Sequence, residues 1–198
     1  MNNNFSNFKK IVENTRCTRR FKKDITIDKN ELIELIDIAR TVSSGKNMQP
    51  LKYIAITDDK IKDEVYKPLV WAAHLTDWDQ NKDEKPSAYI LVINDTSIEG
   101  FSAIDSGIAI QTIMLGATAK GYAGCILASI NKVEYKKLFN LENHLEPMFI
   151  IALGVKDENI EVVDVNTQNG DTNYYRDQNS THFVPKRKLN EVLIDENN

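Results

Sequence analysis

The sequence predicts a single globular domain over residues 1–198 that combines helices with strands. The chain has 198 residues, of which 41% are hydrophobic, enough to form a sizeable core in one domain. Some segments carry apolar residues at helical spacing, while short apolar runs bounded by turn residues indicate strands elsewhere. The sequence contains no internal repeat, so a repeat architecture is not expected.

The charge and the termini narrow the class of protein. A net charge of -4 argues against a nucleic-acid binder that depends on bulk positive charge, although a local basic cluster can still bind an anion. The first four residues are polar, and no apolar run approaches the roughly 20 residues that span a bilayer. We therefore expect a soluble, cytoplasmic protein without membrane contacts.

Cysteine and histidine give no sign of a structural disulfide or a metal site. Cys17 lies among arginines and Cys125 in an apolar segment, so reduced thiols are expected. His74, His144 and His182 do not have the spacing of metal ligands.

Two helices are predicted in the first quarter of the chain. The apolar residues of segment 5–14 recur at helical spacing and predict the first helix. Asp28 and Glu31 have the spacing of a capping box, so a second helix should start there and run to about Thr41. The small residues at 43–45 end it.

The rest of the predicted core alternates between strands and helices. Strands are expected over 51–57, 88–93, 123–128 and 148–155, and helices over 59–65, 103–120 and 131–139. The apolar residues of segment 103–120 are spread so widely that this helix should be buried nearly all round. Segment 71–85 is expected to be a surface excursion, which could cover a ligand.

The C-terminal segment 157–198 is predicted to be an extended arm. It is rich in Asn, Asp and Gln, and Tyr174 and Tyr175 interrupt the polar stretch. Because such a segment has no apolar face large enough for a core of its own, we expect it to wrap another surface, most simply a second subunit.

A basic cluster follows the first helix. Arg16, Arg19 and Arg20 surround Cys17 and Thr18, so several guanidinium groups and neighbouring donors could meet a doubly charged phosphate. The alternative is a solvated basic turn, which is the commoner outcome for an isolated charge run. The cluster alone does not decide between them.

The loop over residues 43–50 carries more hydrogen-bonding side chains than an ordinary connection. Turn chemistry alone could explain its small residues and its proline. Functionally, Asn47 and Gln49 offer both donors and acceptors, as the polar edge of a flavin ring requires.

Together, these segments resemble the FMN-dependent nitroreductases. Residues 16–21 are similar to the family's basic-Ser-basic-Phe motif, and residues 44–50 to its Ser-x-x-Asn-x-Gln-Pro loop. Residues 105–121 are similar to the family's central helix, and 185–189 to its closing basic motif. The likeness spans most of the chain.

The resemblance implies a fold and an assembly. The fold is an α+β sandwich of the nitroreductase kind, with helices flanking a mainly antiparallel central sheet. The implied assembly is a homodimer with two FMN sites in the subunit interface, each subunit embraced by its partner's arm.

The resemblance also implies a set of cofactor-binding residues. Those expected to contact FMN are Arg16, Cys17, Thr18, Arg19, Ser44, Asn47, Gln49, Ala128, Ser129, Lys186 and Arg187. The FMN phosphate and the ring edge would be bound by Arg16, Cys17 and Arg19. The ring would be bound by Asn47 and Gln49, and Arg187 would also bind the phosphate. The sequence departs from the family in three places: Cys17 stands where a serine is usual, and Leu51 replaces the tryptophan often found after the Gln-Pro pair. The stretch 127–129, with Ala128 and Ser129, lacks the Glu-Gly pair of well-known members.

The implied activity is a two-step exchange. NADH or NADPH gives hydride to FMN and is replaced by an electron-poor acceptor such as a nitroaromatic or a quinone. The flavin carries the chemistry, so no catalytic side chain is expected. The alternatives are a non-catalytic flavin-binding or sensor protein, favoured by the altered region 128–129, and a specialised flavin reaction such as reductive dehalogenation or ring cleavage.

Overall fold

A computed structural model describes residues 3–75, 80–166 and 170–194. Its internal contacts form two compact units. The core unit consists of Met1–Trp71 and Gln80–Lys156, and the terminal unit consists of Ala72–Asp79 and Asp157–Asn198.

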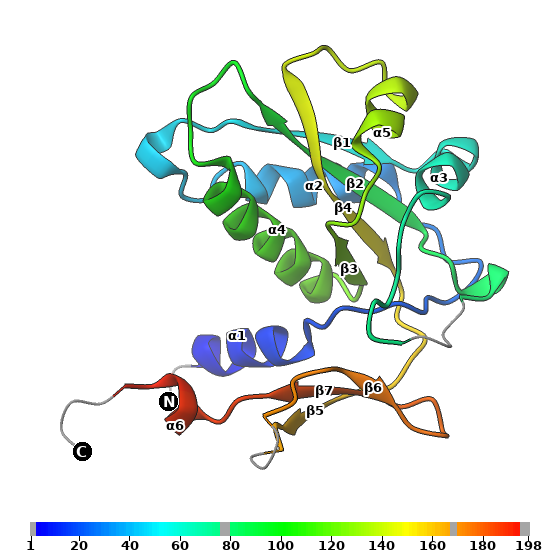
Figure 1. Ribbon diagram of the computed structural model, residues 1–198, viewed down its shortest axis with the longest axis vertical. Helices are drawn as coiled ribbons and strands as arrows, with labels where there is room; N and C mark the ends of the chain where they lie inside the picture. The colour runs from blue at the N-terminus through cyan, green and yellow to red at the C-terminus, as the bar shows by residue number, and fades with distance from the viewer. Residues whose placement is uncertain (1–2, 76–79, 167–169, 195–198) are drawn as a thin grey trace. The chain divides into compact units, whose positions relative to one another are not determined.

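A four-stranded sheet forms the centre of the core unit (Figure 1). Its strands, in spatial order, are β1 (Leu51–Ile56), β2 (Ala88–Asp95), β4 (Leu145–Gly154) and β3 (Ala123–Leu127). All three neighbouring pairs are antiparallel. In the register, Leu91 of β2 lies opposite Ile54 on one side and Ile150 on the other. The predicted antiparallel central sheet is therefore confirmed.

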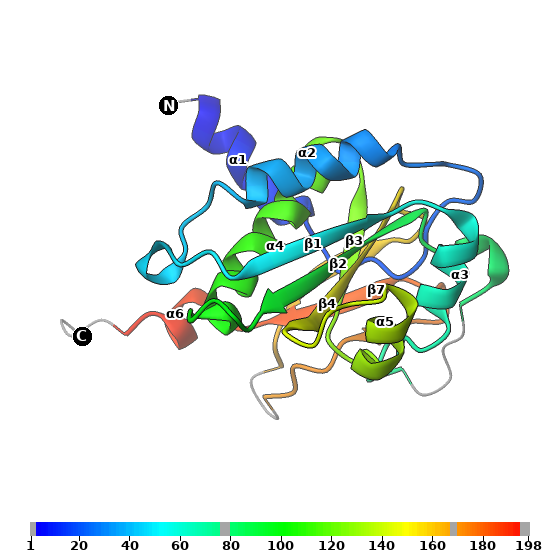
Figure 2. The same ribbon diagram turned by 90° about the horizontal axis from the view of Figure 1, so that it is seen from above.

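Helices cover both faces of this sheet, which makes an α+β sandwich. The helices of the core unit are α1 (Asn3–Asn14), α2 (Lys29–Ala39), α3 (Asp59–Tyr66), α4 (Ser102–Ala119) and α5 (Lys132–Leu138). Figure 2 shows α2 and α4 on one face and α3 and α5 on the other. Side chains alternate along β2: Ile90 and Val92 pack in the cluster of α2 and α4, and Tyr89 and Leu91 in the opposite cluster. A one-residue slip of the register would exchange these faces.

The start of α2 has the predicted cap. The Asp28 side chain accepts a hydrogen bond from the Asn30 backbone N–H at 2.7 Å, and the Glu31 carboxylate accepts one from the Asp28 backbone N–H. The Glu31 carboxylate also accepts a hydrogen bond from the Tyr122 hydroxyl at 2.6 Å. This contact joins the cap of α2 to the chain just before β3.

Replacing Tyr122 by phenylalanine should lower the free energy of unfolding by about 1 kcal/mol at pH 8, because a partly exposed hydrogen bond to a carboxylate is lost. The bond to Glu31, followed by burial, raises the pKa of Tyr122 to about 12. Because the unfolded phenol ionises near pH 10, the contribution is complete below pH 10 and disappears as the pH rises through about 12.

Urea unfolding at several pH values measures the effect of the Tyr122→Phe change. The difference from the wild type should shrink between pH 10 and 12. A difference that stays constant over this range would contradict the assignment. Tyr175→Phe, at an exposed tyrosine, is the control and should leave stability unchanged.

The outer face of α4 is exposed in the single chain. The inner face packs Ile110 and Ile113 against the core, whereas Ile104 and Ile108 are 63% and 38% exposed. The prediction of burial nearly all round is therefore wrong for one chain, since α4 has apolar residues on both faces and the sheet covers only one. None of the described helices is long and apolar enough to span a membrane.

The terminal unit contains a second, smaller sheet. In it, β5 (Ile160–Asp164) pairs in parallel with β7 (His182–Lys186), and the two-residue β6 (Tyr175–Arg176) pairs antiparallel with β7. A short helix, α6 (Leu189–Val192), follows. These strands were not expected from the polar composition of the segment. That residues 157–198 wrap a second subunit stays a prediction.

Two predicted segments extend beyond the described residues. The surface excursion over 71–85 contains a short 3-10 helix, η2 (Lys82–Glu84), but residues 76–79 lie outside the described ranges. The predicted arm likewise includes the undescribed residues 167–169 and 195–198.

Candidate functional site

The basic segment after α1 lies along the edge strand β3. The Thr18 backbone N–H donates to the Gly124 carbonyl at 2.8 Å, and Cys17 forms an isolated parallel bridge with the same glycine. Thr18 is 1% exposed and Arg19 is 9% exposed. The Gln80 side-chain amide holds the Arg19 carbonyl at 2.6 Å. The segment is therefore fixed to β3, with Thr18 and Arg19 buried and Cys17 exposed, unlike a fully solvated turn.

Gly124 packs closely against β4. A Cβ at this position would lie 2.7 Å from the Ala152 carbonyl oxygen and 2.8 Å from Leu153 Cδ2. Only a residue without a side chain fits beside β4 here. The position of β3 against β4 thus depends on a glycine, and the same residue contacts Cys17 and Thr18.

The three arginines of the cluster have different surroundings. Arg16 donates through Nε to the Glu13 carbonyl at 2.9 Å and through Nη2 to the Val12 carbonyl at 3.2 Å, at the end of α1. A guanidinium has five N–H groups, so within the described part of the chain three of those of Arg16 form no hydrogen bond (5 − 2 = 3). Arg19 Nη1 lies 3.5 Å from the Cys17 carbonyl. Arg20 Nε forms an ion pair with Glu84 Oε2 at 3.5 Å, so its role is structural.

A buried aspartate holds the loop over residues 43–50. The carboxylate of Asp105, on α4, accepts from the Ser44 hydroxyl at 2.6 Å and from the Gly45 backbone N–H at 2.9 Å. The Ser44 oxygen in turn accepts from the Gln49 backbone N–H at 2.9 Å. The loop contains a 3-10 helix, η1 (Gly45–Asn47).

The backbone of this loop is strained. Lys46, Asn47 and Gln49 have φ values of 51°, 57° and 54°, in the left-handed region that disfavours residues with a side chain. Strained residues persist only where the surrounding structure holds them. The bonds from Asp105 and Ser44 supply that support.

The loop presents two amide side chains to solvent. The Gln49 amide N–H donates to both the backbone and the side-chain oxygen of Asn47 at 3.1 Å. Among the residues that the structure describes, no hydrogen bond involves the Asn47 side-chain N–H or the Gln49 side-chain oxygen. The Asn47 side-chain N–H and the Gln49 side-chain oxygen are therefore available to a ligand. Such a pair suits the edge of a heterocycle on which hydrogen-bond donors and acceptors alternate.

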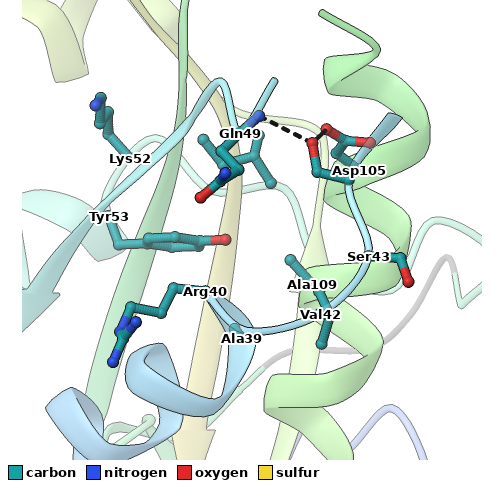
Figure 3. A pocket seen from close by; sticks show the side chains of 11 residues that line it. Ala39, Arg40, Val42, Ser43, Gln49, Lys52, Tyr53, Asp105 and Ala109 are labelled. Atoms are coloured by element: carbon teal, nitrogen blue, oxygen red, sulfur yellow. Dashed lines mark hydrogen bonds between the residues drawn. The ribbon is translucent and has the colours of Figure 1, made fainter. Parts of the chain in front are cut away.

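A cavity of about 210 Å³ lies behind the loop, between the end of α2, β1 and α4. Figure 3 shows the Tyr53 side chain reaching into it between Gln49 and Arg40. Burial, and secondarily the negative charge of Asp105, raises the pKa of Tyr53 to about 12, so its phenol stays protonated at neutral pH. The cavity is smaller than the roughly 300–1,000 Å³ of typical small-molecule pockets.

The two parts of the predicted site lie at opposite ends of α4. The Thr15 and Thr118 hydroxyl oxygens are 2.8 Å apart, which places the basic segment at the end of this helix. Asp105 holds the loop at its start. Thr118 comes 13 positions after Asp105 (118 − 105 = 13), which corresponds to about 20 Å at the α-helical rise. One chain therefore does not bring residues 16–19 and 44–49 together.

The remaining predicted residues lie elsewhere. Ala128 and Ser129 are exposed in the loop that follows β3. Lys186 ends β7 in the terminal unit, and Arg187 follows it, with Nη1 4.0 Å from Glu191 Oε1. Within the described ranges, acidic, histidine and cysteine side chains form no group of three that could hold a metal ion.

Two structural residues of the site were missed by sequence reasoning. Asp105 is the only charged residue in the sequence of segment 102–119. An acidic residue in so apolar a helix indicates a buried, hydrogen-bonded carboxylate and could have been identified from the sequence. Gln80, which fixes the Arg19 carbonyl, follows a segment without a pattern and gave no such signal.

Comparison with known proteins agrees with this fold. A model of the nitroreductase family matches residues 12–155. The chain is 22% identical over 181 residues to YodC of Bacillus subtilis, named as an NAD(P)H nitroreductase, covering 73% of this chain and 87% of that protein. Similar solved structures include one from Parabacteroides distasonis, named as an NADH dehydrogenase/NAD(P)H nitroreductase, with a TM-score of 0.69, 20% identity, and 97% and 98% of the two chains covered.

A further solved structure comes from Staphylococcus epidermidis and is named as an NAD(P)H:FMN oxidoreductase. Its TM-score is 0.62 at 19% identity, over 76% of this chain and 87% of that one. At these identities the structures show a shared fold, while the family match covers most of the chain. The chain belongs to the nitroreductase family.

Proposed function

We propose that this chain is an FMN-dependent enzyme that passes hydride from NADH or NADPH to a small electron-poor acceptor, such as a nitroaromatic or a quinone. Family membership makes it an oxidoreductase. The observation that carries the finer proposal is the fixed basic segment on β3, where Thr18 and Arg19 are buried. A solvated turn, the competing interpretation, would leave these residues exposed.

The residues of the core unit fit FMN chemically. Arg16 and Arg19 offer guanidinium donors, which match phosphate oxygens in charge and geometry. Asn47 and Gln49 offer a donor and an acceptor to the polar edge of the ring. When bound, FMN supplies the hydride chemistry, so the protein's part is to hold the ring and exclude water from one face.

We infer that a complete site needs two copies of the chain. The body of α4 separates the two sets of residues by about 20 Å, and the cavity behind the loop is too small for a whole FMN. The outer face of α4 offers a surface for a second copy, because Ile104 and Ile108 are exposed and a Cβ on Gly107 would meet nothing within 4 Å. Residues 16–19 of one copy would then join residues 44–49 of the other.

The colour of the purified protein tests the proposal. A yellow preparation should release FMN on denaturation and bleach under anaerobic conditions when NADH or NADPH is added. Steady-state oxidation of the nucleotide should then follow when a quinone or a nitroaromatic is supplied. A yellow protein that neither nucleotide bleaches would favour the flavin-binding or sensor alternative, and a colourless protein that binds no added FMN would refute the proposal.

Sedimentation velocity tests the assembly separately. We expect a dimer at micromolar concentration. A monomer that still binds FMN tightly would show that one chain forms the site and would refute the two-copy arrangement.

A further inference from the structure

The cavity behind the loop over residues 43–50 has an apolar wall. Its apolar lining residues are Ala39, Val42, Leu51, Tyr53 and Ala109. Ala39 and Ala109 belong to the buried cluster between the sheet and helices α2 and α4, and the other three pack against that cluster. The wall is therefore built on the close-packed interior of the core unit.

The Tyr53 hydroxyl is the polar group that this wall presents to the cavity. In the described part of the chain, no hydrogen bond involves it. Other buried or half-buried tyrosines do have acceptors: the Tyr122 hydroxyl donates to Glu31 at 2.6 Å, and that of Tyr135 to the Val65 carbonyl at 2.7 Å. The raised pKa of Tyr53 keeps its phenol protonated at neutral pH. The hydroxyl can therefore donate to a molecule in the cavity.

The two cationic side chains that line the cavity already have partners. Arg40 Nε pairs with Asp37 Oδ1 at 2.6 Å, and Lys52 Nζ lies 3.8 Å from Asp95 Oδ2. The side chains of Arg40 and Lys52 are 67% and 50% exposed, so water also screens their charges. They give an anion in the cavity little attraction.

The carboxylate of Asp105 disfavours an anion at the Tyr53 hydroxyl. Asp105 lines the same cavity, and its negative charge contributes to the raised pKa of Tyr53. A second negative charge bound to this phenol would be repelled in the same way. The cavity therefore suits a neutral molecule.

The volume of the cavity sets the size of that molecule. An apolar cavity of about 150 Å³ holds one benzene molecule. This cavity, at about 210 Å³, has room for a single six-membered ring with a short substituent. In Figure 3 the Tyr53 hydroxyl points into the cavity, toward the side where Val42 and Ala109 lie.

We propose that this cavity is a binding site for a neutral, monocyclic aromatic molecule with one hydrogen-bond acceptor, such as an aryl ketone. The ring lies against the apolar wall, and the Tyr53 hydroxyl donates to the acceptor oxygen. Apart from Ser44 and Gln49, none of the described residues that line the cavity belongs to the flavin contacts proposed above. The site goes beyond the proposed function and does not depend on it, since no electron transfer takes part.

Calorimetric titration of the purified full chain tests this site with two neutral probes. Acetophenone carries a carbonyl oxygen on its ring substituent, and toluene is a similar ring without the oxygen. We expect acetophenone to bind with a dissociation constant on the order of 1 mM, as suits so small a ligand. Benzoate, which is an anion of similar size, should bind at least about fivefold more weakly than acetophenone.

Two variants locate the bound molecule. Tyr53→Phe should raise the dissociation constant for acetophenone about fivefold, the effect of losing one neutral hydrogen bond, and leave that for toluene unchanged. Ala109→Val fills part of the cavity and should weaken both probes at least about tenfold. Tyr175→Phe, at an exposed tyrosine, is the matched control and should change neither constant.

Tyr53→Phe removes no hydrogen bond from the described part of the chain, so it should keep the fold. It decides the matter if Ala109→Val does not fold. Absence of acetophenone binding at about ten times the expected constant would refute the site. Equal changes for acetophenone and toluene in Tyr53→Phe would also refute it, as would benzoate binding tighter than acetophenone.

Competition with FMN separates this site from the flavin site. Excess FMN should not displace acetophenone, because the cavity is too small for a whole FMN. Displacement would assign the cavity to the flavin site and refute a separate one. If the chain binds no FMN but still binds acetophenone through Tyr53, the proposed function fails while this inference stands.

Discussion

Replacing Arg16 and Arg19 together by alanine is expected to weaken FMN binding by at least about 100-fold. Each guanidinium would contribute a charge-assisted hydrogen bond to the phosphate, and two such bonds at about 1.5 kcal/mol each amount to two powers of ten. The fold should tolerate the change at Arg16, because the carbonyls of Val12 and Glu13 that it bonds lie at an exposed helix end. Riboflavin binding should change much less than FMN binding.

Equilibrium dialysis and fluorescence titration of the Arg16→Ala/Arg19→Ala protein measure this loss. The double change Lys60→Ala/Lys132→Ala removes the same charge from exposed positions and serves as the control. If the arginine variant keeps FMN through dialysis as well as the wild type does, the phosphate assignment is wrong. Equal losses in the arginine and lysine variants would point to net charge instead.

Replacing Asp105 by alanine is expected to lower the free energy of unfolding by about 3 kcal/mol, since two hydrogen bonds to a buried carboxylate are lost. The loop over residues 43–50 should then leave its strained conformation, because Ser44 and Gly45 lose their anchor. Asn47 and Gln49 would be displaced with it. FMN and riboflavin share the ring, so the Asp105→Ala change should weaken both by a similar factor.

Urea unfolding and the two flavin titrations test the Asp105 prediction. Asp37→Ala is the matched control, because its carboxylate pairs with Arg40 on the exposed surface of α2 and should contribute less than about 0.5 kcal/mol. A selective loss of FMN binding in Asp105→Ala would contradict the assignment of this loop to the ring. Unchanged stability would contradict the anchoring role of the carboxylate.

The helices and central strands were predictable because their signals are local. The cap of α2 needs only Asp28 and Glu31, three residues apart, and both form the expected bonds. The predicted strand over 51–57 corresponds to β1, and that over 88–93 corresponds to β2, which extends two residues further. In the terminal unit such signals fail, because the 17 residues of mostly polar sequence between β5 and β7 carry no strand pattern, and the buried ion pair of Glu158 with Arg176 beside these strands joins residues far apart in sequence.

The candidate site was predictable in its residue types and not in its arrangement. The sequence indicated hydrogen-bond donors at residues 16–19, which suit a phosphate, and amide side chains at 47 and 49, which suit the edge of a flavin ring. The separation of the two groups along α4 depends on contacts such as Ser44 with Asp105, 61 residues apart in sequence. The exposed face of α4 was mispredicted for a related reason, because periodicity does not tell which apolar face the same chain covers.

The position of the basic segment against β3 also affects solubility. β3 is an edge strand, and an edge strand presents unpaired N–H and C=O groups that can recruit a strand from another molecule. Cys17 and Thr18 occupy part of that edge through Gly124. The segment therefore also shields the sheet against uncontrolled pairing, and we expect changes that detach it to cause aggregation.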